Sequence, residues 1–263
     1  MFNRLEAMWY WLTTDPIGFI IYLIYFTVSL LGTLVLHEYA HAFIAYKCGD
    51  PTAKMLGRLT LNPAKHLDPL GTLSMVLLGF GWAKPVPINP RNFKNRVQDD
   101  FLVSIAGITV NFTLFIICTA LMVGLNRFIW KPEVINFYGA HNLLASNSIG
   151  YSAILSGNIS ANKELFLNQW LPYVQRFLMM FSKFNLVIAV FNFLPIPPLD
   201  GFHIFNNILL KGKLQLNAQT YRIMNIILIF FMFSGVLGKI ITLITSAIEG
   251  GVLKIFLYLT GVI

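Results

Sequence analysis

The sequence predicts an all-α integral membrane protein that crosses the bilayer several times. Hydrophobic residues make up 56% of the 263 residues and charged residues only 11%, whereas soluble domains carry about 25% charged residues. The mean hydropathy is +0.67. Several apolar stretches are long enough to cross a bilayer, which takes about 20 residues of helix. Together these observations favour a polytopic membrane protein over a soluble one.

Four apolar stretches are the predicted spans, and polar loops separate them. They cover approximately residues 17–46, 101–125, 171–193 and 221–248. The apolar residues 252–263 are few, so they would form either an interfacial helix or a weak fifth span. We therefore expect about four to five transmembrane helices in a single integral-membrane domain over residues 1–263.

A shorter apolar run, residues 70–83, contains three glycines, Gly71, Gly79 and Gly81. Its length favours a segment that enters the membrane and turns back. Such backbone is tolerated at membrane depth only where protein or a wet cavity covers it. We expect a re-entrant segment, with a β-hairpin as one possible form, near residues 70–90.

The basic residues predict how the chain is oriented. The loop at residues 47–100 holds eight Lys and Arg residues, and Lys211, Lys213 and Arg222 follow the third span. The positive-inside bias places both loops in the cytoplasm. The net charge of +8 is spread over such loops and not along one face or in a long run, so we expect no nucleic-acid partner.

The first predicted span contains a His-Glu-x-x-His motif. Residues four apart share a face of a helix, so the imidazoles of His37 and His41 can bind one zinc ion. Glu38 can then reach a water molecule on that metal. Ionisable groups inside a membrane span are functional by default, which favours a metal site over a structural polar cluster. At about 1.5 Å per residue, His37 lies roughly 15 Å from Lys47, inside the hydrocarbon region and nearer the cytoplasmic face.

A third ligand must come from elsewhere, because a catalytic zinc ion usually has three protein ligands and one open position. The third span ends at a group of prolines, which break the helix. Asp200 follows this break, where an irregular segment could fold back toward the metal. His203 is the rival ligand, and position alone favours Asp200 only modestly. His66 and His141 lie in loops on opposite sides of the membrane.

The first span and the later Asn-x-x-Pro-x-Pro-x-x-Asp-Gly sequence at residues 192–201 together resemble the site-2 protease family of intramembrane zinc metalloproteases. The resemblance extends to residues 57–63 and 81–87, and to Gly107 and Asn111. The chain departs from the family at Ile108, where proline is common. With no room for a PDZ domain, and no nucleotide-binding regulatory domain after the last span, it resembles a compact member.

The resemblance implies that His37, His41 and Asp200 bind one zinc ion and that Glu38 is the catalytic acid and base. Asn192 would lie near the site and polarise the substrate carbonyl, although a helix-end cap or a contact between helices is the alternative. The implied activity is endoproteolysis of transmembrane segments of other membrane proteins, in signalling or in clearance of membrane peptides.

Two other functions remain as alternatives. A transporter would be expected to contain inverted repeats, which the sequence does not show. An inactive protease-like scaffold would normally have lost a ligand or the glutamate. We expect a multi-pass protein of the bacterial cell membrane whose active site lies nearer the cytoplasmic side. Its partners would be the lipid bilayer and a substrate helix, and self-association into a homo-oligomer is left open.

Overall fold

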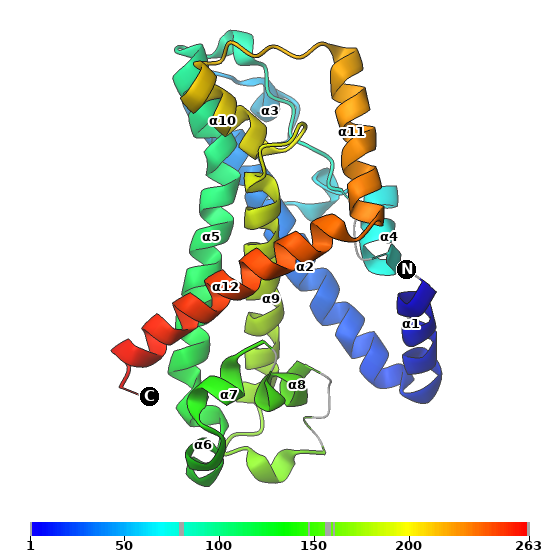
Figure 1. Ribbon diagram of the computed structural model, residues 1–263, viewed down its shortest axis with the longest axis vertical. Helices are drawn as coiled ribbons and strands as arrows, with labels where there is room; N and C mark the ends of the chain where they lie inside the picture. The colour runs from blue at the N-terminus through cyan, green and yellow to red at the C-terminus, as the bar shows by residue number, and fades with distance from the viewer. Residues whose placement is uncertain (1, 79–81, 147, 156–158, 160, 262–263) are drawn as a thin grey trace. The chain divides into compact units, whose positions relative to one another are not determined.

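The computed structural model describes the chain except residues 1, 79–81, 147, 156–158, 160 and 262–263. Its described part consists of helices and the loops that join them, and its β-type pairing is an isolated antiparallel bridge between Trp130 and Phe166. Within this part, four helices are long and apolar enough to cross a membrane (Figure 1). They are α2 (Pro16–Lys47), α5 (Arg96–Ile129), α9 (Leu171–Phe193) and α12 (Val236–Leu259). The predicted all-α polytopic fold is confirmed.

Shorter helices and turns fill the connections between these spans. The short α-helices are α1 (Phe2–Thr14), α3 (Thr52–Met55), α4 (Pro69–Leu78), α6 (Pro132–Tyr138), α7 (Ala140–Leu144), α8 (Ile149–Leu155), α10 (Asp200–Leu210) and α11 (Ala218–Phe233). The single 3-10 turns are η1 (Pro63–Lys65), η2 (Pro90–Asn92) and η3 (Lys163–Leu165).

The fourth predicted span is divided in the structure, so its predicted bounds were wrong. Helix α11 ends at Phe233, and Gly235 adopts a φ of 74° before α12 begins. This left-handed conformation interrupts a right-handed helix and suits glycine, which has no Cβ. The candidate span is therefore α12, and it includes most of the apolar residues that were expected to form a separate C-terminal element.

The segment expected to be re-entrant is a short helix followed by extended chain. Helix α4 covers its first part, and residues 82–89 form no strand. The possible β-hairpin is thus not found in the described residues, because the first arm is helical. Residues 79–81, which carry two of the three glycines, lie outside the described part.

The chain is divided into two compact units, and each long helix contributes to both. The first, which we call the motif unit, comprises Met1–Leu5, Leu31–Phe112 and Val187–Thr242, and it contains both sequence motifs. The second comprises Glu6–Leu30, Thr113–Leu186 and Leu243–Ile263. Its apolar core gathers around Trp130, Leu143 and Ile154, and the ring of Trp130 packs 4.7 Å from that of Phe166. The single domain over residues 1–263 stays a prediction.

Asp50 organises the polar loop that follows α2 in the motif unit. Its side chain is 0% exposed. It accepts hydrogen bonds from the backbone N–H of Thr52 (3.1 Å) and of Asn89 (2.7 Å), and from the side-chain amide of Asn92 (2.8 Å). Burial alone would raise the pKa of Asp50, but these bonds, together with one from the Thr52 hydroxyl, outweigh it and hold the pKa below its usual range. Asp50 therefore anchors the far end of the extended segment to the end of α2.

Arg58 and His66 hold the near end of the same segment. The Nη2 of Arg58 donates to the carbonyl oxygens of Lys84 (2.8 Å) and Pro85 (3.2 Å). The backbone N–H of Lys84 donates to the carbonyl of His66 at 2.9 Å. Because an extended chain has no internal hydrogen bonds, these contacts with Asp50, Arg58 and His66 determine where residues 84–89 lie.

We expect Asp50→Ala to lower the free energy of unfolding by about 1–3 kcal/mol, because it leaves buried donors without an acceptor. Thermal unfolding in detergent at neutral pH measures this change. Since the pKa of Asp50 is lowered in the folded state, its contribution is present at neutral pH. The part that depends on the negative charge is lost as the pH falls from about 4 through the lowered pKa, so the difference between the variant and the wild type should narrow there. Glu164→Ala, at an exposed carboxylate, is the control, and an equal loss in both variants would contradict the assignment.

Candidate metal centre

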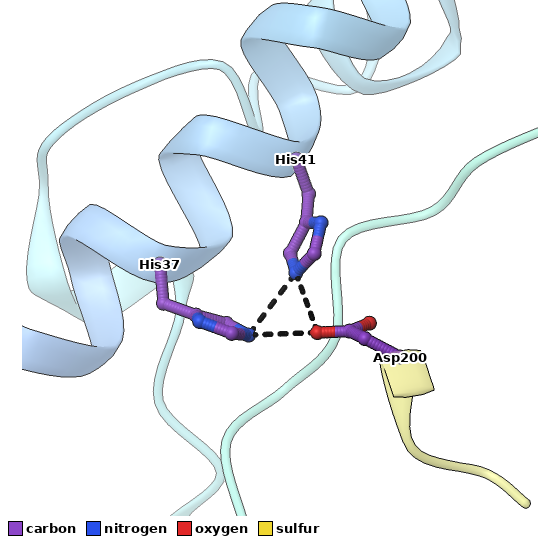
Figure 2. Close-up of side chains that lie close together, drawn as sticks. All are labelled: His37, His41 and Asp200. Atoms are coloured by element: carbon purple, nitrogen blue, oxygen red, sulfur yellow. Dashed lines mark hydrogen bonds and ion pairs between the residues drawn. The ribbon is translucent and has the colours of Figure 1, made fainter. Parts of the chain in front are cut away.

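His37 and His41 lie one turn apart on α2 and direct their imidazoles to the same point (Figure 2). The side chains are buried, at 4% and 6% exposure. Their Nε2 atoms are 3.0 Å apart, and the ring planes are nearly perpendicular, at 83°. The helical spacing predicted from the sequence therefore brings both ring nitrogens together.

Asp200 approaches the two histidines from a distant part of the chain (Figure 2). Its Oδ2 lies 3.3 Å from Nε2 of His37 and 3.2 Å from Nε2 of His41. The chain leaves α9 at Phe193 and turns through the proline-rich residues 194–199, which include a cis peptide bond between Pro197 and Pro198. Asp200 then begins α10. The segment folds back toward the histidines, in agreement with the modest preference for Asp200 over His203 that its position in the sequence gives.

The first turn of α10 suits a buried carboxylate for two reasons. The N-terminal end of a helix carries partial positive charge, which stabilises an anion there. Gly201 allows the turn to pack directly on the end of α9, because a Cβ at this position would overlap the carbonyl oxygens of Phe193 and Leu194. The Asp-Gly pair thus combines a ligand with the close contact that places it.

Three residues of α5, spaced four apart, lie against the two histidines. The Nδ1 of His41 lies 2.7 Å from the carbonyl oxygen of Val103. One turn on, a Cβ at Gly107 would come within 2.5 Å of both His37 Cε1 and His41 Nε2. One turn further, the amide nitrogen of Asn111 lies 3.3 Å from Nδ1 of His37. This face of α5 therefore contacts both imidazoles.

The arrangement of the three side chains fits a zinc ion. Zinc binds histidine nitrogen and carboxylate oxygen at about 2.0–2.1 Å in tetrahedral geometry, which places neighbouring ligand atoms about 3.3 Å apart. The observed separations of 3.0, 3.2 and 3.3 Å match this edge. The Oδ2 of Asp200 is buried and accepts no hydrogen bond of good geometry from the described part of the chain. Two imidazoles and an unbonded carboxylate oxygen are a donor set suited to a metal ion.

Glu38 lies beside the histidines on α2, partly buried, and its Oε2 accepts a hydrogen bond from the backbone N–H of Val86 at 2.8 Å. This is the extended segment that Asp50 and Arg58 hold in place. Asn192, near the end of α9, donates from its side-chain amide to the carbonyl of Ile188 at 3.1 Å. That bond within one helix is compatible with the alternative of a local structural role, and the catalytic role of Asn192 stays a prediction.

The other histidines have different neighbours. The Nδ1 of His203 lies 3.3 Å from Oδ2 of Asp100, which also accepts a hydrogen bond from Asn207 at 2.7 Å. Burial alone would lower the pKa of His203, but the hydrogen bond with Asp100 and the negative charges of Asp100 and Asp200 together outweigh it and raise the pKa. The Nε2 of His66 lies 2.7 Å from the carbonyl oxygen of Thr60. His141 lies in α7, in the second unit.

The groups that contact His37, His41 and Glu38 could not be identified from the sequence. The carbonyl of Val103 and the N–H of Val86 belong to the backbone, so residue identity carries no signal for them. Gly107 and Asn111 were noted as part of a resemblance, without a role. Their four-residue spacing in an apolar helix is the signal that indicates a shared face.

The fold and this site define a helical membrane protein of the metalloprotease class. Residues 25–235 match the family described as "Peptidase family M50". The chain belongs to this family, the site-2 protease family, and is a zinc-dependent protease embedded in a membrane. No solved structure matches the chain.

Relatives agree with this assignment. The chain is 38% identical over 188 residues to "Putative zinc metalloprotease YwhC" of Bacillus subtilis, an alignment covering 72% of this chain and 70% of the relative. It is 32% identical over 130 residues to "Putative zinc metalloprotease Rip2" of Mycolicibacterium smegmatis, covering 46% of this chain and 48% of the relative. The predicted family, enzyme class and zinc cofactor are confirmed.

We expect Gly107→Ala to lose zinc, because the added methyl group would occupy the space of both imidazoles. Overpacking of this kind costs about 1–3 kcal/mol, so the melting temperature should also fall. Metal analysis of the detergent-purified protein measures the first effect. Gly124→Ala on the same helix is the matched control, since a Cβ there meets no atom within 4 Å. Full zinc content in Gly107→Ala would contradict the close approach of α5.

Proposed function

We propose that this protein is an intramembrane endopeptidase that cleaves transmembrane segments of other membrane proteins. In this proposal His37, His41 and Asp200 hold one zinc ion, and Glu38 acts as general base and then general acid. The observation that carries the proposal is the convergence of two imidazoles and a carboxylate beside Glu38. The two histidines and Glu38 belong to α2, a helix long and apolar enough to span a bilayer.

The metal supplies Lewis-acid activation of a water molecule and of the scissile carbonyl. The chain supplies the proton transfers. Because Oε2 of Glu38 accepts the N–H of Val86, the carboxylate is held in one orientation and Oε1 is available to take a proton from the attacking water. The same oxygen can deliver that proton to the leaving amine. Asn192 would add a hydrogen bond to the developing oxyanion by rotating its amide away from Ile188.

The position of the histidines in α2 supports cleavage within the membrane. His37 lies ten residues before Lys47, the last residue of α2, which corresponds to about 15 Å of helix. The basic loop that follows α2 favours a cytoplasmic location for that end. The active site would then lie inside the bilayer, nearer the cytoplasmic side. The bacterial relatives support a bacterial cell membrane as its location.

A transmembrane substrate helix must unwind before it can be cut, because its carbonyl groups are engaged in hydrogen bonds within the helix. The extended residues 82–89 offer a surface for the unwound peptide. They form no strand of their own. The N–H groups of Lys84, Val86 and Asn89 already have partners, so a second extended chain would pair with the backbone groups that remain. Glu38 contacts this segment at Val86, which would place a peptide paired along it beside the catalytic carboxylate.

Glu38→Gln should keep about one zinc ion per chain while losing proteolysis, because glutamine retains the shape of glutamate but cannot take the proton. General acid and base catalysis contributes about 10²–10⁴-fold, so cleavage should fall by at least the lower figure. Substrates that copurify with Glu38→Gln, identified by mass spectrometry, provide the assay.

Glu133→Gln, at an exposed carboxylate in α6, is the control for the Glu38 experiment and should cleave normally. Proteolysis at the wild-type rate by a clean Glu38→Gln preparation would refute the role of Glu38. Wild-type protein that binds no zinc would instead favour the transporter or scaffold alternatives.

Destabilising the substrate helix at the cleavage site should accelerate cleavage. An Ala→Gly change weakens a helix by about 1 kcal/mol, which corresponds to roughly fivefold if unwinding precedes the chemical step. Measured rates for substrates with Gly or Ala at the same position test this expectation. The same change two turns away from the site is the control. Equal rates at both positions would argue against unwinding.

A further inference from the structure

We propose that Asn111 is a positioning residue for the metal centre: its side-chain carbonyl accepts the Nδ1–H of His37 and thereby keeps the Nε2 of His37 free to bind the metal. The inference rests on the zinc site proposed above. It concerns a contact between α5 and α2 within the motif unit, and it follows from the protonation of the two imidazoles.

A metal ligand needs a free lone pair on Nε2, and this condition is clearest at His41. The carbonyl oxygen of Val103, 2.7 Å from Nδ1 of His41, can only accept a hydrogen bond. The proton of the neutral imidazole must therefore be on Nδ1, which leaves a lone pair on Nε2. That lone pair points to the centre of the three-residue cluster. A backbone carbonyl thus sets His41 in the form that a metal ligand needs.

His37 needs the same form, and Asn111 is the group that faces its Nδ1, at 3.3 Å. If the amide nitrogen of Asn111 donates to Nδ1, the proton of His37 must be on Nε2, where it blocks metal binding. If the amide is turned by 180°, its oxygen accepts from Nδ1–H and the lone pair of Nε2 is free. The two ends of an asparagine amide occupy nearly the same space, so both orientations fit.

Metal binding favours the orientation in which Asn111 accepts. Asn111 is 0% exposed, and its Oδ1 has no hydrogen-bond partner in the described part of the chain. Turning the amide gives this buried oxygen a donor but moves the amide nitrogen to the place where the oxygen had none, so the choice between the two orientations is set by the metal, which would need the free lone pair of His37 Nε2. Gly107, one turn earlier, makes the contact possible because it allows α5 to approach the rings. A metal ligand whose second nitrogen is held in this way is oriented and made more basic.

The test is the zinc affinity of detergent-purified full-length protein, measured by competition with a chelator. Asn111→Leu removes the acceptor at similar volume, and loss of such a partner weakens metal binding by about 10–100-fold. Asn126→Leu is the matched control, because Asn126 is a second buried asparagine of α5, at 2% exposure, whose side chain has no hydrogen-bond partner among the described residues. It should bind zinc as the wild type does.

Asn111→Asp separates this role from packing. Aspartate keeps an acceptor for Nδ1–H, so zinc affinity should stay within a few-fold of the wild type or increase. A packing role predicts the reverse order, since leucine would be the milder change and a buried charge the more severe one. Zinc binding by Asn111→Leu equal to the wild type, or weakening in Asn111→Asp as large as in Asn111→Leu, would overturn the inference.

The two proposals can fail separately. If wild-type protein binds zinc and His37→Ala abolishes binding while Asn111→Leu does not weaken it, the metal site stands and only the role of Asn111 is wrong. If His37→Ala leaves zinc affinity unchanged, the ligand assignment itself is wrong and the inference falls with it. Should Asn111→Leu fail to fold, Asn111→Ala, which also lacks the acceptor, takes its place in the comparison with Asn111→Asp.

Discussion

The motif unit depends on the close approach of α5 to the histidine-bearing face of α2. A Cβ at position 107 would lie within 2.5 Å of both imidazoles, so only glycine permits this distance. The approach brings a backbone carbonyl at Val103 and an amide at Asn111 to the two Nδ1 atoms. In a low-dielectric interior, unpaired polar groups are costly and paired ones are strong. The close packing of α5 on α2 therefore also supplies the partner groups of both Nδ1 atoms.

A second close contact places the carboxylate. The first turn of α10 packs on the last carbonyl groups of α9 through Gly201, and this contact directs Asp200 at the nitrogens that α2 presents. A buried carboxylate without a counter-charge would be expensive in such a setting. The helix N-terminus and the two imidazoles compensate for part of that cost, and a metal ion would compensate for more. The two imidazoles and the carboxylate thus form a donor set of the kind and spacing that zinc prefers.

The side chain of Glu38 is held by the loop that follows α2. Asp50 and Arg58 hold the two ends of the extended segment, and the N–H of Val86 in its middle bonds to Glu38. A polar network among loop residues thus reaches Glu38, the proposed proton-transfer group, through one backbone hydrogen bond. This route links the position of the loop to the orientation of Glu38.

The sequence by itself determined the membrane class, the long helical spans, and the convergence of His37 and His41, because composition and helical periodicity are local properties of the chain. It also identified Asp200 as a ligand candidate, yet it could not separate Asp200 from His203, since both follow the same proline break. Only the tertiary structure separates their positions, because it brings Asp200 to the two imidazoles and pairs His203 with Asp100. It also decided that Gly235 interrupts the last apolar stretch and that Val86, Val103 and Asn111 contact the site. These outcomes depend on which groups of distant segments come close together in the folded chain. No local pattern of residue types encodes that proximity.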